Sequence, residues 1–218
     1  MKETRLKGIY EQKGWFWTKN LVPKVSVYGE KLFRQGEIEY RQWDPKRSKL
    51  GAALKKGVSQ IGIKPGSTVL YLGCSTGTTV SHVSDMVGES GRVYALDVAP
   101  RVMREMALLT RRRTNIVPIC ASASNPLAYT QFLESVDVVF MDIAQPNQVD
   151  IFLRNCEAFL KPTGFGLLAL KSRSIDITKK PKQVFTESKI LIEKQMKIVD
   201  QRTLDPFELD HAFYVCKK

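Results

Sequence analysis

The stretch TVLYLGCSTGTTVSHVSDMVG, residues 68–88, decides the fold of this 218-residue chain. It opens with an apolar run that has the length of a buried strand and ends at Gly73. Gly77 follows, and Thr78 and Thr79 begin a segment with the apolar spacing of a helix. Glycines let a ligand approach the backbone closely, and a helix N-terminus offers it free N–H groups. The stretch therefore predicts a strand–turn–helix unit with a ligand at the turn, although a purely structural turn would share this pattern.

Strands and helices continue to alternate from about residue 47 to the C-terminus. Apolar runs predict further strands at residues 92–98, 116–121, 136–143 and 165–172. Amphipathic spacing predicts helices at residues 100–113, 147–161 and 182–196. The closing segments 197–204 and 211–218 have no helix between them, so they must pair antiparallel. The order predicts an α/β fold, a Rossmann-like parallel sheet with helices on both faces and a terminal antiparallel hairpin.

The first 46 residues have a different composition. Aromatic, alternating segments are interrupted by Gly and Asn, as in GIYEQKGWFWTKN (8–20) and EIEYRQW (37–43). This pattern predicts short antiparallel strands. We therefore expect a small N-terminal β-rich domain at residues 1–46 and a Rossmann-like domain at residues 47–218. The aromatic run from Trp15 to Trp17 is expected to form the core of the small domain, or to stack on RNA bases.

The charge of the chain points to a polyanionic partner. Lys and Arg outnumber Asp and Glu by 34 to 22, which gives a net charge of +12, and the surplus is densest in the first quarter of the chain. Such a surplus favours nucleic acid, although it also serves solubility. Five arginines in the helix predicted at 100–113 are expected to contact RNA phosphates or to face solvent, namely Arg101, Arg104, Arg111, Arg112 and Arg113.

Composition also excludes several classes of protein. The hydrophobic content of 43% is too high for a disordered chain. No apolar run approaches the ~18 to 20 residues of a membrane span, and the N-terminus lacks the apolar core of a signal peptide. We therefore expect a soluble, intracellular protein. Buried thiols, rather than disulfides or zinc ligands, are expected at Cys74, Cys120, Cys156 and Cys216. Only two histidines are available to add ligands, so we expect no metal site.

Asp97, at the end of the second strand, indicates a ribose-bearing cofactor. A carboxylate there can accept hydrogen bonds from both ribose hydroxyls, which suits NAD and S-adenosylmethionine alike. NAD-binding folds favour G-x-G-x-x-G, and the second of these glycines is missing here. The antiparallel closing hairpin resembles the ending of Rossmann-like methyltransferases, so we expect S-adenosylmethionine.

Three polar residues follow or begin predicted strands at one edge of the sheet. Asp142 ends one strand, Lys171 ends the next, and His211 begins the last. Ligands bind at the carboxyl edge of such sheets. Lys171 is expected to be the ion-pair partner of Asp142, a catalytic group, or both. A strand-end pair without catalytic function, and a bystander His211, are the alternatives.

A cluster of cations precedes the first helix of the larger domain. EYRQWDPKRSKLGAAL (39–54) places Lys46, Arg47 and Lys49 between an Asp-Pro turn and an apolar segment. We interpret this stretch as the hinge between the two domains. Lys49 is the candidate for catalysis and is expected to face Asp142, whereas Lys46 and Arg47 are candidates for RNA phosphates or solvent.

Six motifs, in this order, resemble the fibrillarin family, specifically its short archaeal form. They are YRQWDPKRSKLGAAL, LGCSTGTTVSHVSD, VYALDVAPRVMRE, MDIAQPNQ, LKSRSID and PFELDHAFYV. The resemblance spans nearly the whole chain. It implies S-adenosylmethionine-dependent 2′-O-methylation of rRNA and a catalytic set of Lys49, Asp142, Lys171 and His211. It further implies cofactor binding by Gly73, Gly77, Thr78, Thr79, Asp97, Val98, Ser122, Ala123, Asp142, Ile143, Ala144 and Gln145.

The same resemblance implies partners. The chain is expected to be the catalytic subunit of a box C/D ribonucleoprotein, in which guide RNA selects the nucleotide in target rRNA or tRNA. A Nop-domain scaffold protein and a kink-turn-binding ribosomal protein complete that assembly, in the cytoplasm of an archaeal cell. The isolated chain is then nearly inactive. A non-catalytic scaffold subunit with a methyltransferase fold is the alternative.

Two positions depart from the family pattern. Asp97 stands where many relatives carry Glu, and it should still reach a ribose. The third strand usually ends in Gly-Asp-Ala, whose carboxylate accepts from the adenine amine, but this chain has Ala121, Ser122 and Ala123. Because Ser122 is uncharged, we expect cofactor binding to be weaker by about 1 kcal/mol.

The sequence leaves the role of Lys171 open. It either removes the proton of the 2′-hydroxyl as a base or, as a permanent cation, stabilises the developing charge. His211 is expected to position the lysines or to relay the proton.

Overall fold

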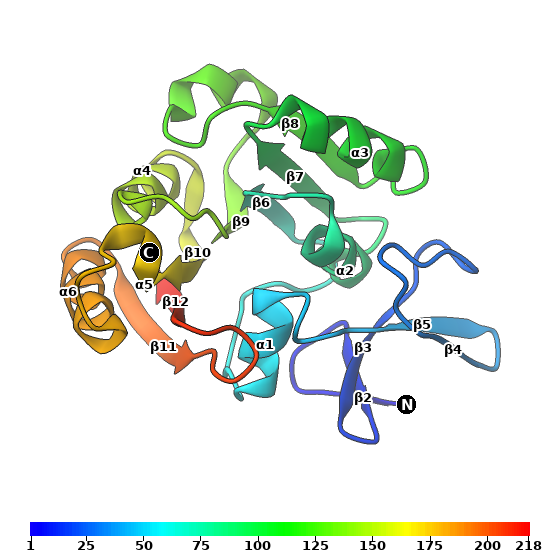
Figure 1. Ribbon diagram of the computed structural model, residues 1–218. Helices are drawn as coiled ribbons and strands as arrows, with labels where there is room; N and C mark the ends of the chain where they lie inside the picture. The colour runs from blue at the N-terminus through cyan, green and yellow to red at the C-terminus, as the bar shows by residue number, and fades with distance from the viewer.

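The computed structural model describes residues 1–218 and contains two sheets (Figure 1). The N-terminal sheet is antiparallel throughout and has the strand order β1-β2-β3-β5-β4. Its strands are β1 (Lys2–Glu3), β2 (Ile9–Gln12), β3 (Trp15–Lys19), β4 (Leu32–Gln35) and β5 (Ile38–Gln42). The short antiparallel strands predicted for this segment are confirmed.

The second sheet has seven strands in the order β11-β12-β10-β9-β6-β7-β8. Its strands are β6 (Thr68–Leu72), β7 (Arg92–Asp97), β8 (Ile116–Cys120), β9 (Val136–Met141), β10 (Leu160–Lys171), β11 (Lys197–Thr203) and β12 (His211–Lys217). The run from β10 to β8 is parallel, whereas β12 pairs antiparallel with both β10 and β11. The predicted parallel sheet and closing hairpin are confirmed.

Helices cover both faces of the larger sheet. They are α1 (Lys49–Lys55), α2 (Thr78–Val87), α3 (Pro100–Thr110), the 3-10 helix η1 (Pro126–Phe132), α4 (Gln148–Phe159), α5 (Ser172–Ile175) and α6 (Pro181–Glu193). The sequence did not predict η1 or α5, because both are too short to show an apolar period. None of the helices has the length and hydrophobicity that crossing a lipid bilayer requires.

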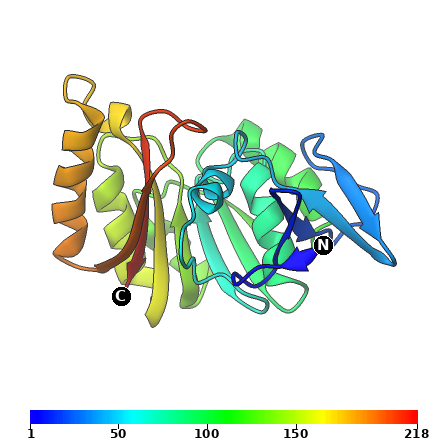
Figure 2. The ribbon, with the colours of Figure 1, turned by 90° about the horizontal axis from the view of Figure 1, so that it is seen from below.

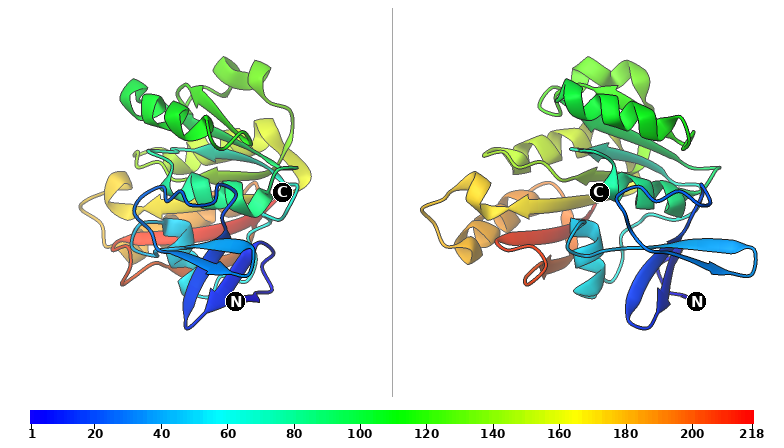
Figure 3. Two further views of the ribbon diagram at one scale, coloured as in Figure 1. Left: turned by 90° about the vertical axis from the view of Figure 1, so that its right-hand side faces the viewer. Right: turned by 45° about the vertical axis from the view of Figure 1, so that its right-hand side comes forward.

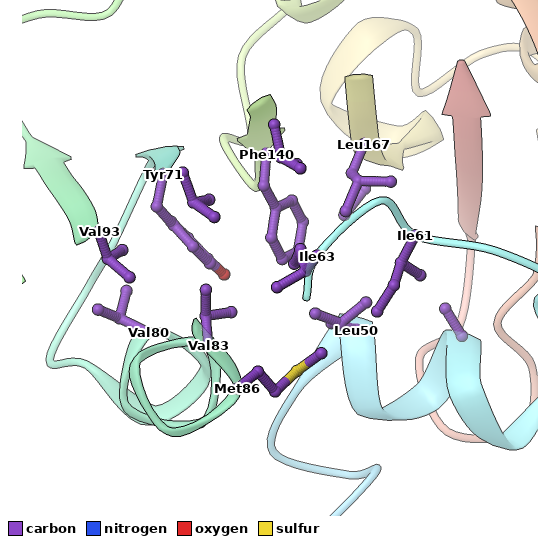
Figure 4. Packing of buried hydrophobic residues seen from close by; sticks show 14 of the residues in the cluster. Leu50, Ile61, Ile63, Tyr71, Val80, Val83, Met86, Val93, Phe140 and Leu167 are labelled. Carbon is purple, nitrogen blue, oxygen red and sulfur yellow. The ribbon is translucent and has the colours of Figure 1, made fainter. Parts of the chain in front are cut away.

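Alternating strand residues face opposite ways and build a core on each side of the larger sheet. One core joins the strands to α1, α2 and α3, and the other joins them to η1, α4 and α6. Figure 4 shows part of the first core, where α1 and α2 contribute Leu50, Val80, Val83 and Met86 beneath the strand residues Tyr71, Val93, Phe140 and Leu167.

The N-terminal sheet packs on α2 through buried charges. It lies beside α1 and α2, far from α6 and the C-terminal strands (Figures 2 and 3). Arg41 of β5 forms ion pairs with Glu30 at 2.6 Å and with Asp85 of α2 at 2.8 Å. Arg113 binds the other oxygen of Asp85 at 2.6 Å. The expectation that Arg113 contacts RNA or solvent is therefore wrong, because its guanidinium neutralises a buried carboxylate.

His82 of α2 completes this junction. The hydroxyl of Thr18 donates to Asp85, so it must accept from Nδ1 of His82 at 2.8 Å. Nε2 is then an acceptor, and the hydroxyl of Tyr28 donates to it at 2.7 Å. Burial, together with the charges of Arg41 and Arg113, holds the pKa of His82 well below its usual value of 6.5. The ring is therefore a neutral part of the core.

The cysteines are free thiols, and three of them are buried as expected, namely Cys74, Cys156 and Cys216. The expectation is wrong for Cys120, which is exposed. It ends β8, an edge strand of the sheet, where alternate side chains point to solvent.

Candidate functional site

A pocket of about 230 Å³ lies at the carboxyl ends of β6, β7, β8 and β9. Nine of the predicted cofactor residues line it, namely Gly73, Asp97, Val98, Ser122, Ala123, Asp142, Ile143, Ala144 and Gln145. Four further lining residues were not among the predicted cofactor residues, namely Ser75, Leu96, Ala121 and Ser124. Each of these four residues lies one or two positions from a predicted cofactor residue. That closeness in sequence is the only signal that could have indicated them.

Gly73 allows the strand ends around the pocket to approach closely. Its N–H donates to the carbonyl of Leu96 at 2.8 Å, and the N–H of Asp142 donates to Leu72 at 2.9 Å. A Cβ at position 73 would lie 2.5 Å from the carbonyl oxygen of Asp142, and the backbone has a φ of 84°. Only glycine fits both constraints. The turn thus brings Asp142 to the pocket wall.

Asp97 is held by backbone donors. One carboxylate oxygen accepts from the N–H of Ser75 at 3.1 Å, and the other accepts from the N–H of Ala99 at 3.0 Å. Each oxygen keeps a lone pair for a further donor. Since Asp97 lines the pocket, its carboxylate can accept from the two hydroxyls of a ribose.

The remaining predicted cofactor residues, Gly77, Thr78 and Thr79, do not line this pocket. Gly77 precedes α2 with a φ of 93°, and a Cβ there would lie 2.5 Å from the side chain of Leu109 in α3. Thr79 is buried and donates to the hydroxyl of Ser48 at 3.0 Å. In the structure this turn joins α2 to α1 and α3.

Ser122 lines the pocket where the family pattern places a carboxylate. It is exposed, and its hydroxyl accepts weakly from the N–H of Ser124 at 3.3 Å. The next residue, Ala123, is buried, and its carbonyl accepts from Asn155 of α4 at 2.9 Å. The backbone of this loop is therefore fixed, and the departure at Ser122 changes only the group offered to a ligand.

Lys49 and Asp142 form a half-buried ion pair beside the pocket. Ser48 caps α1 by accepting from the N–H of Gly51 at 3.1 Å, which places Lys49 in the first turn. The ammonium lies 2.9 Å from one carboxylate oxygen of Asp142 and 3.2 Å from the other. Burial lowers the pKa of Lys49, but the charge of Asp142 and its hydrogen bond outweigh burial and raise that pKa above 10.5. Lys49 is therefore a cation at neutral pH.

The structure corrects the expectation for Lys171. We expected an ion pair between Lys171 and Asp142, but the Lys171 side chain is exposed and Asp142 pairs with Lys49. Lys171 ends β10 directly opposite His211 of β12. Both follow the alternation of Ala169 and Phe213, whose side chains lie in the core on the α1 side of the sheet. Lys171 and His211 therefore project toward the same side as Lys49.

His211 is a neutral imidazole with a free acceptor. Its Nδ1 lies 2.7 Å from the carbonyl of Leu209, so Nδ1 carries the proton and Nε2 has an open lone pair. Burial lowers the pKa of His211 below 6.5. The Leu209 carbonyl opposes this shift, and the charge of Lys49 adds to it. Nε2 can thus accept a proton or a hydrogen bond at neutral pH.

Gln148, a residue the sequence did not indicate, connects the two parts of the site. Its side chain is fully buried at the start of α4. The side-chain oxygen accepts from the N–H of Lys171 at 3.0 Å, and the amide nitrogen donates to the carbonyls of Lys171 at 3.1 Å and Gln145 at 3.0 Å. Gln148 thereby fixes the end of β10 relative to a pocket-lining loop. A polar residue in the first turn of an amphipathic helix is usually exposed, so its pattern gave no signal.

Together these groups suit the transfer of a group from a pocket-bound cofactor. The pocket offers acceptors for a ribose and closely spaced backbone for the rest of a nucleoside. A cation–carboxylate pair and a neutral imidazole belong to the same edge of the sheet. The arrangement provides a binding site, an electrostatic clamp and a proton acceptor.

Comparison with known proteins identifies relatives of the whole chain. The family model described as Fibrillarin matches residues 1–218. The fibrillarin-like rRNA/tRNA 2′-O-methyltransferase of Thermococcus onnurineus is 49% identical over 201 residues, which cover 92% of this chain and 89% of the relative.

Solved structures agree with this match. Aeropyrum pernix fibrillarin, solved in complex with natively bound S-adenosyl-L-methionine, has a TM-score of 0.90 at 43% identity and covers 99% of this chain and 96% of its own. The fibrillarin of a fibrillarin/Nop5p complex also has a TM-score of 0.90, at 37% identity, over 98% of this chain and 99% of its own.

Proposed function

Because the chain belongs to the fibrillarin family, we propose that it methylates ribose 2′-hydroxyls of rRNA and tRNA as the catalytic subunit of a guide-directed box C/D ribonucleoprotein. Its relatives are named rRNA/tRNA 2′-O-methyltransferases at 45 to 49% identity. It is an enzyme that depends on S-adenosylmethionine, and it acts in the processing of pre-rRNA and tRNA.

The pocket fits the cofactor chemically. Asp97 is oriented by two backbone N–H groups and can accept from the ribose hydroxyls. Ser122 and Ala123 would border the adenine, and the segment from Asp142 to Gln145 would border the methionine end. When bound, S-adenosylmethionine supplies an activated methyl group. The chain itself has to hold the 2′-hydroxyl in position and remove its proton.

Lys49 and Asp142 perform the positioning in this proposal. Asp142 lines the pocket and binds Lys49 with both carboxylate oxygens, so its orientation is fixed from the side of α1. A well-oriented reactant pair removes most of the entropic barrier of a transfer reaction. The positive charge of Lys49 also favours a ribose oxygen that is losing its proton.

Lys171 and His211 are the candidates for receiving that proton. Lys171 is exposed, so it can reach a ribose that arrives from solvent, and it lies opposite His211. His211 presents an unprotonated Nε2 at neutral pH. We propose that Lys171 orients the 2′-oxygen and that His211 accepts or relays the proton. If Lys171 instead only stabilises negative charge, His211 is the one group that takes the proton. The pH dependence of the methyl-transfer rate then follows the titration of His211 alone.

The assembly supplies specificity. The solved fibrillarin/Nop5p complex supports a Nop-domain scaffold as one partner. We propose that a guide RNA and a kink-turn-binding ribosomal protein complete the particle, in the cytoplasm of an archaeal cell. The net charge of +12 is consistent with this RNA-rich environment.

One observation carries the proposal, namely that Asp142 lines the pocket and also binds Lys49. The test reconstitutes the chain with guide RNA, target RNA, both protein partners and labelled S-adenosylmethionine. Wild type should label the target RNA, and Asp142→Asn should not. If wild type transfers no label in a particle that is active with the Thermococcus relative, the chain is instead a scaffold subunit.

A further inference from the structure

The outer face of the N-terminal sheet is unusually aromatic. Along β3, Thr18 bonds to α2 and Phe16 packs on the core, so these alternate positions face the body of the protein. Trp15 and Trp17 must therefore point to the other side. The exposed face of such a sheet normally carries polar residues. Here the ring of Phe33 packs 6.0 Å from that of Trp17 on this face.

Two adjoining hollows on this face form one groove, which we call the aromatic groove. The first has a volume of about 270 Å³ and is lined by Trp15, Trp17 and Phe33 together with Lys13, Lys31 and two glutamines. The second shares Trp15, Lys31 and one of the glutamines with the first, and it extends to Arg47. Trp15 is 42% exposed at the point where the hollows meet.

Lys55 of α1 contacts the ring of Trp15. Its ammonium lies 5.4 Å from the ring centroid and donates to the carbonyl of Gly14. This cation covers part of the indole and holds the ring, which leaves other parts of it exposed. An aromatic ring that is fixed in advance loses little entropy when a second ring stacks on it.

The charges along the aromatic groove favour an anion. No carboxylate lines the first hollow, where Lys13 and Lys31 are both exposed. Of the two carboxylates that line the second hollow, Glu30 is neutralised by Arg41 at 2.6 Å. The lysines of the first hollow therefore meet no opposing charge within it.

Arg47 supplies a further cation in the second hollow. Its guanidinium is held 5.6 Å from the ring centroid of Tyr28, and the residue is exposed. Asp44, the other carboxylate there, accepts from the backbone N–H of Lys46 at 2.9 Å. The groove as a whole keeps a surplus of positive charge. Stacking rings, amides and cations together are the groups that bind single-stranded nucleic acid.

The aromatic groove also ends near the catalytic site. Arg47 is two residues before Lys49, and consecutive Cα atoms are about 3.8 Å apart, so their backbones lie within about 8 Å of one another. Lys49 is the ion-pair partner of Asp142. The groove-lining Arg47 and the pocket-side Lys49 thus belong to one short segment of the chain.

We propose that the aromatic groove binds an unpaired nucleotide of the RNA strand that is bound at the catalytic site. A base stacks on Trp15, the glutamine amides meet its edge, and Lys13, Lys31 and Arg47 contact phosphates. The inference rests on the proposed function for the identity of the RNA. Binding of RNA by the groove can nevertheless be measured without methyl transfer.

The test measures binding of a fluorescein-labelled oligoadenylate to the full chain by fluorescence anisotropy. Trp15→Ala should bind it about 5- to 100-fold more weakly, the loss expected for one stacked base. Trp15→Tyr keeps a ring and should restore most of the affinity. Phe132→Ala is the matched control, because Phe132 is 53% exposed and lies far along the chain on η1. It should bind like wild type.

Salt dependence provides a second readout. Lys13→Gln with Lys31→Gln should lower the slope of log affinity against log salt by about one to two, since each phosphate contact releases about one counterion. The control pair Lys182→Gln with Lys197→Gln removes the same charge from another part of the chain. Its slope should be steeper than that of the Lys13/Lys31 variant and close to that of wild type. Calorimetry with S-adenosylmethionine should give the same affinity for every variant, which separates this test from the test of the catalytic site.

Two results would overturn the inference. One is a Trp15→Ala chain that unfolds like wild type and binds the oligoadenylate with wild-type affinity and salt slope. The other is a Trp15→Ala chain that keeps its RNA affinity but no longer binds the Nop-domain partner, which would assign the aromatic groove to protein.

Discussion

At the scale of single residues, the ion pair between Lys49 and Asp142 joins α1 to the carboxyl end of β9. Both side chains are about one-fifth to one-quarter exposed, so the pair is partly shielded from water. The raised pKa of Lys49 keeps it cationic, which makes it a poor base and a good clamp. In the proposed mechanism, proton removal therefore involves Lys171 and His211 on the neighbouring strands.

Replacing Lys49 separates catalysis from cofactor binding. Lys49→Ala should lower methyl transfer about 100-fold, because Asp142 loses its orienting partner and the ribose oxygen loses a nearby cation. Affinity for S-adenosylmethionine, measured by calorimetry, should stay nearly unchanged. Lys194→Ala is the control, since Lys194 is exposed and makes no ion pair. Equal losses of activity and cofactor affinity would assign Lys49 a structural role.

Ser122 allows the departure from the family pattern to be tested. Ser122→Asp should tighten binding of S-adenosylmethionine several-fold, about 1 kcal/mol, because a carboxylate accepts more strongly from the adenine amine. Asn125→Asp adds the same charge to the same loop, and position 125 does not line the pocket, so it should have little effect. Titration calorimetry decides between them. An unchanged affinity of Ser122→Asp for S-adenosylmethionine would contradict this prediction.

The sequence located most of these residues and one of their two expected pairings. Asp142, Lys171 and His211 each lie at a strand end, and the alternation along a strand is enough to place them on one side of the sheet. The expectation that Lys49 faces Asp142 is confirmed by their ion pair, whereas the expected pair between Lys171 and Asp142 is wrong. Gln148 was missed because its burial depends on how α4 docks against β10.

At the scale of elements, apolar runs predicted the strands of the larger sheet well. Predicted and observed helix ends differed where tertiary contacts or the next strand ended the helix early. The helix predicted at 100–113 ends at Thr110, and Arg113 lies beyond it, bound to Asp85. The helix predicted to reach residue 161 ends at Phe159, because β10 already begins at Leu160. Periodicity carries no information on such contacts.

The turn after β6 is the element on which the pocket depends most. Gly73→Ala would place a Cβ 2.5 Å from the carbonyl of Asp142, so the ends of β6 and β9 must separate. We expect a loss of affinity for S-adenosylmethionine and of methyl transfer, in addition to about 1–3 kcal/mol of backbone strain. Calorimetry measures the affinity for S-adenosylmethionine, and chemical denaturation measures the loss of stability.

Gly88 supplies the matched control for that strain. It has a φ of 70°, and no atom lies within 4 Å of the position that a Cβ would take, so Gly88→Ala adds backbone strain without a clash. Gly88→Ala should lose stability but keep its cofactor affinity. If both variants kept that affinity, the close approach at Gly73 would not shape the pocket.

At the scale of the whole molecule, a buried polar junction joins the N-terminal sheet to the larger sheet. Arg41, Asp85, Arg113 and His82 are all buried there. The sequence did not predict this junction, because it covers the face of α2 that would be solvent-exposed in a Rossmann-like fold alone. The division into domains at residues 1–46 and 47–218 stays a prediction.

Two buried histidines, His82 in this junction and His211 at the start of β12, make stability depend on pH. Burial lowers the pKa of His82 and of His211 below 6.5 in the folded chain. Below about pH 6.5 the unfolded chain binds protons that the folded chain does not, so stability falls as pH falls. Each histidine contributes up to about 1.4 kcal/mol per pH unit until its folded pKa is reached. Above about pH 7.5 neither contributes.

Urea unfolding at a series of pH values tests this dependence. His82→Gln should be less stable than wild type at every pH, because it disturbs the bonds to Thr18 and Tyr28. Its stability should nevertheless change less steeply between about pH 6.5 and pH 5. A slope equal to that of wild type would show that His82 does not carry the effect.

In the proposed function, this chain methylates the ribose that a guide RNA selects. The most direct measurement maps the methyl group on target RNA in the reconstituted particle, first with one guide and then with a guide whose pairing is displaced by one nucleotide. With wild type the methyl group should move by one nucleotide, and Asp142→Asn should transfer none with either guide. A methyl group that stays in place, or a wild-type chain that is inactive in a particle where the Thermococcus relative is active, would contradict the proposed function.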